Sequence, residues 1–172
     1  MNSTKQLKIN CFYILLTISL SFSCSERFKK DLLPKDYRLL KKESFVGSVD
    51  MIYVYDIKVD SINLSSLHNY PKSCKGENCT SGCEITGWMF YRDIDPEESI
   101  RLLKIVSEQN VNKQHIEIND LIEDMKLNDN ILFSACYVPP IGGKKYKYYE
   151  IMSFLDIEEM KLYVFDYLED PF

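Results

Sequence analysis

The sequence predicts an α+β domain with a mainly antiparallel sheet of about five or six strands and about two or three helices. Three observations predict this class. Strand-like segments lie at both ends of the globular part, helix-like segments cluster in its middle, and the links between the later strands are short. Because parallel strands need long crossover connections, the short links favour antiparallel pairing.

The first strand region is expected over residues 45–59. An apolar set alternates there with a more polar one, so we expect the apolar set to face the core. The apolar set is Met51, Tyr53, Tyr55, Ile57 and Val59, against Ile52, Val54, Asp56 and Lys58. Before this region, residues 36–43 are expected to form a short helix. After it, residues 84–91 read as a second strand, in which Gly87 indicates a bulge or a close backbone approach.

The best local helix signal begins at Asp95. Asp95 can cap the helix, Pro96 suits its first position, and Glu98 completes a capping box. This helix should end near Asn110, and spacing places a buried face on it. The expected face consists of Ile100, Leu103 and Val106 or Ser107.

A short edge strand is expected over residues 111–118, followed by a second helix from Asn119 or Asp120 to Leu127. Residues 131–138 are nearly all apolar, as in a central strand. After a turn rich in proline and glycine, residues 146–155 should return as a hairpin partner. Residues 161–168 are expected to form the last strand.

The N-terminus has the layout of a secretory leader. Lys5 and Lys8 precede a short apolar region, residues 11–20, and Cys24 follows after three small or aromatic residues. The apolar region is about half the ~20 residues that a permanent transmembrane helix needs. The sequence therefore predicts export.

This segment resembles the leader of bacterial lipoproteins, in which a cysteine just after the apolar region is diacylated and becomes the first residue. The resemblance covers residues 1–24 and implies that Cys24 is the lipidation site, so that the protein contacts the membrane through an N-terminal lipid. Such leaders usually carry an aliphatic residue three places before the cysteine, where this chain has Ser21. Ser21 and Ser23 also suit ordinary cleavage, which leaves simple secretion and an uncleaved signal anchor as alternatives.

We therefore expect a leader over residues 1–23, a tether with the short helix over 24–44, and one α+β domain over 45–172. Cleavage after residue 23 would leave 149 of the 172 residues, a common size for one domain. Loss of Lys5 and Lys8 would change the formal charge from −5 to about −7. Such an acidic domain is unsuited to nucleic acid, whose phosphates require concentrated lysine and arginine.

The cysteines form the most specific pattern in the chain. If Cys24 carries a lipid, an even set remains for two disulfides in an oxidising compartment. That set is Cys74, Cys79, Cys83 and Cys136. Four cysteines allow three pairings, among which the spacing does not choose. The rival interpretation is a zinc site with His68 or His115, but the paired spacings of zinc ligands are missing, so we expect no metal.

No catalytic residue is predicted, because the sequence contains neither a G-x-S-x-G nor an H-E-x-x-H pattern. Asp93 and Asp95 are interpreted as a turn and a helix cap. The lysine-rich segment after Gly143 lacks the Walker pattern. It is instead a candidate interaction tip with alternating cations and aromatic rings. The tip consists of Lys144, Lys145, Tyr146, Lys147 and Tyr148.

These observations together predict a small, exported, lipid-anchored envelope protein at the outer membrane or cell surface. We expect it to act as a non-enzymatic binding module without a cofactor, with an envelope protein as its partner. The alternative for location is a secreted or soluble periplasmic protein. The alternative for function is an envelope enzyme with an acid/base site assembled from residues that are scattered in the sequence.

Overall fold

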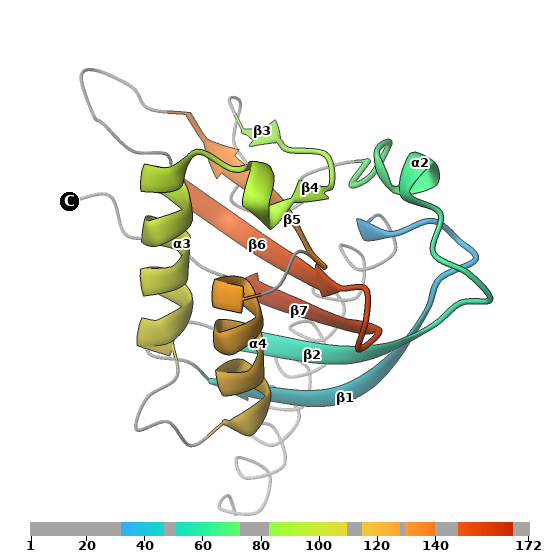
Figure 1. Cartoon of the computed structure of the whole chain (residues 1–172). Helices are drawn as coiled ribbons and strands as arrows, with labels where there is room; N and C mark the ends of the chain where they lie inside the picture. Colours follow the sequence, from blue (N-terminus) through green and yellow to red (C-terminus); the bar gives the residue numbers. More distant parts are fainter. Residues whose placement is uncertain are drawn as a thin grey trace, which may run out of the picture.

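The protein is described by a computed structural model over residues 32–46, 51–72, 83–109, 115–127, 130–139 and 148–166. These residues form an α+β structure in which two helices, α3 and α4, lie side by side across one face of a seven-stranded sheet (Figure 1). All strand pairings in the described part are antiparallel. The predicted fold class is therefore confirmed.

The sheet has the order β1-β2-β7-β6-β5-β3, and β4 also pairs with β5. Its strands are β1 (Arg38–Val46), β2 (Met51–Lys58), β3 (Glu84–Ile85), β4 (Met89–Phe90), β5 (Ile131–Val138), β6 (Tyr148–Asp156) and β7 (Lys161–Asp166). The last strand, β7, lies between β2 and β6, so it joins the N-terminal pair β1–β2 to the later strands. The expected strands over 131–138, 146–155 and 161–168 are confirmed within the described residues.

The α-helices in the described part are α2 (Leu64–Leu67), α3 (Pro96–Gln109) and α4 (Ile116–Leu127), and a 3-10 turn covers Tyr91–Asp93. Asp95 caps α3, since its Oδ1 accepts the backbone N–H groups of Glu97 at 3.0 Å and Glu98 at 3.3 Å. The predicted start and end of α3 are thus confirmed.

The predicted buried face of α3 is right only in part: Val106 is buried and Leu103 packs against the core, but Ile100 does not. Leu102, Ile105, Val106 and Gln109 are buried, whereas Ile100 is 69% exposed. Both sets fit a helical repeat, so the spacing alone could not choose between them. The way that the helix lies on the sheet decides which set is buried.

Both faces of the sheet carry a core. One core lies between the sheet and the two long helices, around Phe133, Phe154 and Phe165. The other covers the opposite face, where Leu32 and Trp88 pack against residues of β2, β5, β6 and β7. The indole Nε1 of Trp88 donates a hydrogen bond to the backbone oxygen of Leu32 at 2.9 Å. Residues from 32 onward therefore belong to the folded domain.

This second core corrects the expectations for the N-terminal part. The expected helix over 36–43 is wrong, because Arg38–Val46 form strand β1, which pairs with β2. Residues 32–44, expected to belong to a tether, are part of the sheet and its core. In β2, Ile52 and Val54 are buried on one face and Tyr55 and Ile57 on the other. The expectation that the odd-numbered set faces a core is therefore confirmed, and the even-numbered Ile52 and Val54 face a second core that the sequence did not predict.

Two further expectations differ from the structure. Helix α4 already begins at Ile116, so the part of the expected edge strand over 116–118 is helical. The expected strand over 84–91 is divided into β3 and β4 around Gly87. A Cβ atom at Gly87 would lie 3.0 Å from the backbone oxygen of His68. The close backbone approach predicted at this glycine is therefore confirmed.

Candidate functional site

The best candidate site is a pocket of about 370 Å³ between α4, the end of β6 with the turn after it, and β7. It is lined by six carboxyl side chains, one ammonium group and one phenol. These belong to Asp120, Glu123, Asp124, Asp156, Glu158, Glu159, Lys161 and Tyr163. The formal charge of this set is −5, so we call it the acidic pocket.

Helix α4 contributes one wall because its acidic residues recur at helical spacing. Asp120 and Asp124 are separated by four positions, and Glu117 lies three positions before Asp120. The opposite side of α4 buries Ile118, Leu121 and Met125 in the core. Like charges at this spacing destabilise a helix by about 0.2–0.5 kcal/mol per pair. The acidic stripe thus costs stability at a surface that faces the pocket.

The turn after β6 is organised by Asp156, which is only 1% exposed. Its Oδ1 accepts the backbone N–H groups of Glu158 and Glu159, both at 2.9 Å. A buried carboxylate is stabilised by such backbone donors. The two hydrogen bonds also fix the backbone that carries the rim residues Glu158 and Glu159.

Asp124 of α4 meets Asp156 at the base of the pocket. The pKa of Asp124 is raised, first by burial and then by the charge of Asp156 and a hydrogen-bond contact with it. The charges of Asp120 and Glu159 raise the same pKa further. The carboxyl groups are therefore close enough to compete for a proton, and the empty pocket disfavours its own full charge.

Tyr163 of β7 reaches the same space from the sheet. Its side chain is 1% exposed, its hydroxyl forms no hydrogen bond within the described residues, and it lines the pocket. Burial raises the pKa of Tyr163, and the charges of Glu117, Asp156, Asp120 and Asp124 raise it further. The phenol therefore stays neutral. Because Tyr163 lines the pocket, its hydroxyl is available for a hydrogen bond to a ligand there.

Basic residues neutralise only part of the negative charge of the acidic pocket. Lys161 Nζ lies 3.1 Å from Glu117 Oε2 and 4.0 Å from Glu159 Oε2. Glu123 on the rim pairs with Lys126 at 2.8 Å. Asp120, Asp124 and Asp156 form no ion pair with a described lysine or arginine. Within the described residues, no group of three or more His, Cys, Asp or Glu side chains has the geometry to hold a metal ion.

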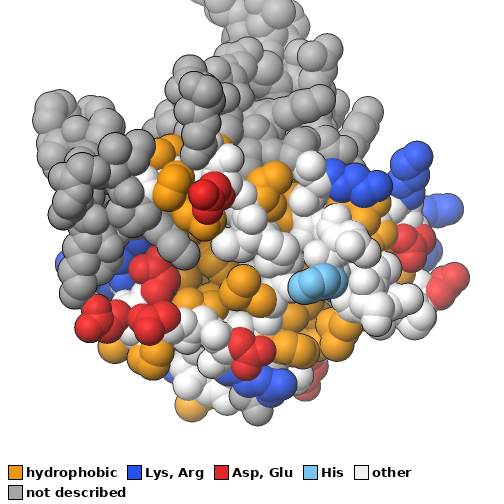
Figure 2. All heavy atoms as spheres, turned by 90° about the horizontal axis from the view of Figure 1, so that it is seen from above, with side chains coloured by type: hydrophobic (Ala, Val, Ile, Leu, Met, Phe, Trp, Pro, Cys, Tyr) orange, Lys and Arg blue, Asp and Glu red, His pale blue; other side chains and the backbone are white. Residues whose placement is uncertain are grey.

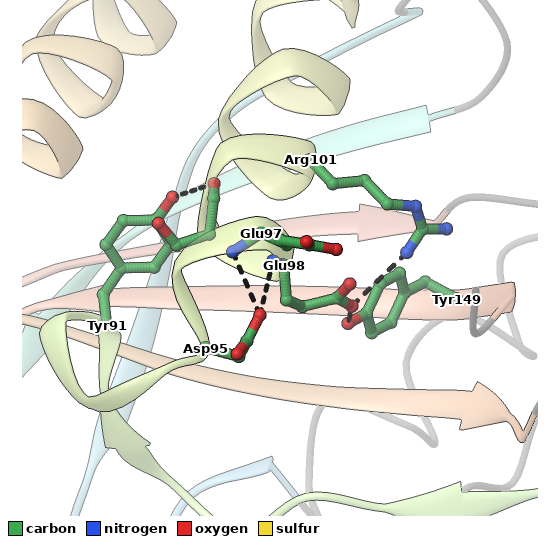
Figure 3. A network of polar contacts seen from close by, with 7 residues as sticks. Tyr91, Asp95, Glu97, Glu98, Arg101 and Tyr149 are labelled. Atoms are coloured by element: carbon green, nitrogen blue, oxygen red, sulfur yellow. Dashed lines mark hydrogen bonds and ion pairs between the residues drawn. The ribbon is translucent and has the colours of Figure 1, made fainter. Parts of the chain in front are cut away.

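A separate polar network fixes α3 to β6 (Figure 3). The Tyr149 hydroxyl donates a hydrogen bond to Glu98 Oε1, which also pairs with Arg101 Nη1 at 3.3 Å. The Arg101 guanidinium lies 5.2 Å from the centre of the Tyr149 ring. Glu98 thus contacts side chains instead of completing the expected capping box. Burial, followed by the Glu98 hydrogen bond, raises the pKa of Tyr149. We interpret this network as a structural clamp.

The two histidines lie away from the acidic pocket. His68 is exposed and lines another pocket of about 350 Å³ together with Trp88 and the exposed Asp93. Figure 2 shows a histidine among hydrophobic side chains on the face seen from above. His115 is half-buried, and its backbone oxygen accepts the N–H groups of Ile118 and Asn119 at 3.2 Å, both at the start of α4.

The predicted cysteine set is described only in part. Cys83 and Cys136 are both disulfide-bonded. No two cysteines within the described residues lie at disulfide distance from one another, so these two are not bonded to each other. Cys136 is buried on β5, opposite Ile85 of β3. Cys74 and Cys79 lie outside the described residues, as do the leader and Cys24. The pairing of the cysteines stays a prediction.

Most of the predicted interaction tip also lies outside the described residues. Lys144, Lys145, Tyr146 and Lys147 are not among the described residues, and Tyr148 is the first residue of β6. No helix in the described part is long and apolar enough to cross a membrane. The acidic pocket is the site that the sequence reasoning missed. The spacing of Glu117, Asp120 and Asp124 was a usable signal for its helical wall.

Comparison with protein-family models, curated proteins and solved structures finds no significant match to this chain. The acidic pocket must therefore be interpreted from its own chemistry. Its elements are a long helix, a hydrogen-bonded turn and a central strand. Sites on such elements are positioned more precisely than sites on loops.

Proposed function

We propose that this protein is a small, exported, lipid-anchored envelope protein that acts as a non-enzymatic binding module. The leader over residues 1–23 and Cys24 support export and anchoring at the outer membrane or cell surface. The acidic pocket supports binding. We infer that the partner is an envelope protein or another ligand that meets the domain outside the cytoplasm.

One observation carries the binding function, namely the side chain of Tyr163, which is 1% exposed, lines the pocket and has no hydrogen-bond partner for its hydroxyl among the described residues. A ligand in the pocket can hydrogen-bond to this hydroxyl in place of water. Asp156 is held beside it by two backbone hydrogen bonds. The pocket is therefore arranged before a ligand arrives, which lowers the entropic cost of binding.

Two disulfides among Cys74, Cys79, Cys83 and Cys136 are part of this proposal. The disulfide-bonded state of Cys83 and Cys136 supports it, as does an exported location. A bond between the cysteine-rich loop and β5 would restrict the unfolded chain and contribute about 3–4 kcal/mol. The lysine-rich tip before β6 stays a second proposed contact surface.

A second candidate function is an envelope enzyme that uses an acid/base pair. The contact between Asp124 and Asp156 favours it, because the raised pKa of Asp124 would let this carboxyl act as an acid beside a second carboxyl group. Their hydrogen-bond contact is closer than the ~5 Å or more that separates the two carboxyl groups of glycosidases. Such a pair would have to share one proton and act on a bound water.

The binding function can be tested by photo-crosslinking in envelope preparations from cells that produce the full chain. A photoreactive residue at position 158, on the pocket rim, should give a discrete crosslinked product. The same residue at position 84, on β3 and outside the pocket lining, should not. Equal labelling from both positions, or none from either, would contradict the proposal.

Anchoring is tested separately by mass spectrometry of the mature N-terminus. We expect diacylated Cys24 as the first residue. An intact leader, or an unmodified residue at the mature N-terminus, would contradict the lipid anchor. This measurement is independent of the pocket, so the two parts of the proposal can fail separately.

A further inference from the structure

We propose that the acidic pocket recognises an organic cation, a primary ammonium or guanidinium group, which binds between Asp124, Asp156 and the hydroxyl of Tyr163. This inference rests on the proposed binding function and names the chemistry of its ligand. It follows from the charge of the pocket, from the Tyr163 hydroxyl and from the way in which Lys161 is already bound.

The charge of the pocket favours a positively charged occupant. Asp120, Asp124 and Asp156 face one another from α4 and from the end of β6 without a described basic partner. Asp156 is buried, and Asp124 is half-buried. Repulsion between carboxylates in such surroundings is stronger than in water. A bound cation would replace this repulsion by attraction.

The Tyr163 hydroxyl supplies an observation that is independent of the charge. It is a neutral oxygen of a side chain that is 1% exposed, it faces the pocket, and it has no hydrogen-bond partner in the described part of the chain. A phenol oxygen can accept a hydrogen bond from N–H while its own O–H is donated to a carboxylate. An ammonium or guanidinium group has several N–H donors, so it can satisfy the phenol and the two carboxylates together.

Size and donor geometry favour an organic cation over a metal ion. The pocket volume of about 370 Å³ is far larger than one ion requires and falls in the range of small-molecule sites. Three carboxylates do not converge in the geometry of a metal centre within the described residues. Ammonium and guanidinium groups need a less exact arrangement of carboxylates than a metal ion does, because they bind them at about 2.7–2.9 Å through several N–H donors.

Lys161 provides an internal example of the proposed contact. Its ammonium group lies at the edge of the pocket, 3.1 Å from Glu117 and 4.0 Å from Glu159. The acidic stripe of α4 and the turn after β6 thus already hold one ammonium group between them. Asp120, Asp124 and Asp156 extend the same arrangement into space that Lys161 leaves open. The occupant we infer would repeat this contact next to Lys161.

The cation can come from two sources, a free polyamine or a lysine or arginine side chain of a protein. We would titrate the purified full chain by isothermal titration calorimetry with spermidine and, separately, with a short peptide that carries a single arginine. The titrations would be run near 0.15 M ionic strength, where screening over ~8 Å suppresses diffuse attraction. Binding of either probe at one site is the expected result. Spermidine binding assigns a free polyamine, and binding of the peptide alone assigns a protein side chain.

Two pocket variants and two matched controls locate the site. Asp124→Asn removes one charge and Tyr163→Phe removes one hydroxyl, and each should weaken binding about tenfold or more. Glu84→Gln and Tyr137→Phe make the same changes where β3 pairs with β5, outside the pocket lining, and Tyr137 donates to Glu84 there at 2.7 Å. The control variants should stay within about twofold of the parent chain.

Three results would overturn the inference: neither probe binds, the controls weaken binding as much as the pocket variants, or calcium alone binds the same residues more tightly. Because Tyr163→Phe removes a hydroxyl that has no described partner, it should fold normally. Crosslinking from position 158 without cation binding would leave the proposed function standing and remove only this inference.

Discussion

Buried tyrosines in this protein differ in what their hydroxyl groups contact. Tyr149 donates to Glu98, and Tyr91 donates to the backbone oxygen of Ser99 at 2.5 Å. Tyr163 is equally buried, but its hydroxyl forms no hydrogen bond within the described residues and opens onto the acidic pocket. Hydroxyl groups of the first kind stabilise the fold. The hydroxyl of Tyr163 is better explained by binding.

This contrast predicts opposite effects of one chemical change. Tyr149→Phe should lower the free energy of unfolding by about 1.5–3 kcal/mol, because it removes a hydrogen bond to the charged, half-buried Glu98 and leaves Arg101 as its donor. Tyr163→Phe should leave this free energy unchanged or raise it by up to about 1 kcal/mol. Urea unfolding of the two variants and the parent chain measures both effects. A similar loss in both variants would mean that the Tyr163 hydroxyl also has a structural role.

The carboxyl group of Asp124 predicts a pH effect. The pKa of Asp124 in the folded protein is raised above its ordinary value of 3.8 by burial and by Asp156, Asp120 and Glu159. The folded state then holds the proton more tightly than the unfolded state, so Asp124 costs stability as the pH rises above about 3.8. Lys161 and Tyr163 also face this group from β7.

Asp124→Asn should therefore stabilise the empty protein at pH 7, and the gain should vanish below about pH 3.8. Melting temperatures measured from pH 3 to pH 8 would check this, with Glu84→Gln as a control of equal charge. A variant that is destabilised at pH 7 would contradict the raised pKa. A stability gain together with a loss of binding is the trade-off typical of functional sites.

At the scale of the elements, α3 mainly packs against the sheet, whereas α4 packs against it and also lines the acidic pocket. The buried side of α3 fills the core against the sheet, and the Glu98 network fixes its first turns to β6 (Figure 3). Helix α4 also buries one side, but its acidic stripe is directed to the pocket. The sequence predicted the extent of α3 well because its cap is a local signal. It placed the buried face only in part, because two overlapping apolar stripes fit the same period.

The correction to α3 can be tested with two substitutions. Leu102→Ala should lower the free energy of unfolding by about 2–5 kcal/mol, because Leu102 is completely buried. Ile100→Ala should change it by no more than about 0.5 kcal/mol, since Ile100 is largely exposed. Chemical denaturation monitored by circular dichroism gives both values. A larger loss of stability in Ile100→Ala than in Leu102→Ala would mean that Ile100 lies on the buried face, as expected from the sequence.

At the scale of the whole molecule, the sheet is covered on both sides. The two long helices cover one face, and the segment before β1, together with α2 and Trp88, contributes to the cover of the other (Figure 1). The sequence predicted a tether where Leu32, Leu33 and Tyr37 are buried. These apolar side chains are separated by charged residues and a proline, so their periodicity was too weak to reveal a packed segment.

This arrangement predicts how far the N-terminus can be shortened. A chain that begins at residue 32 should keep nearly the full stability of the domain. A chain that begins at residue 38 should lose several kcal/mol, because removal of buried leucine and tyrosine side chains costs about 2–5 kcal/mol each. Thermal unfolding of the two truncated proteins would decide. Equal stability would mean that residues 32–37 act only as a tether.

The sequence by itself determined the fold class, helix α3 and strands β5, β6 and β7, because caps, turns and hydrophobic periods are written in neighbouring residues. Only the tertiary structure decided which helix faces are buried and where the acidic pocket lies. Asp124 and Asp156 meet because α4 lies against the end of β6 and the turn that follows it. Such a contact depends on strand order and helix docking, and neither is encoded in a local pattern.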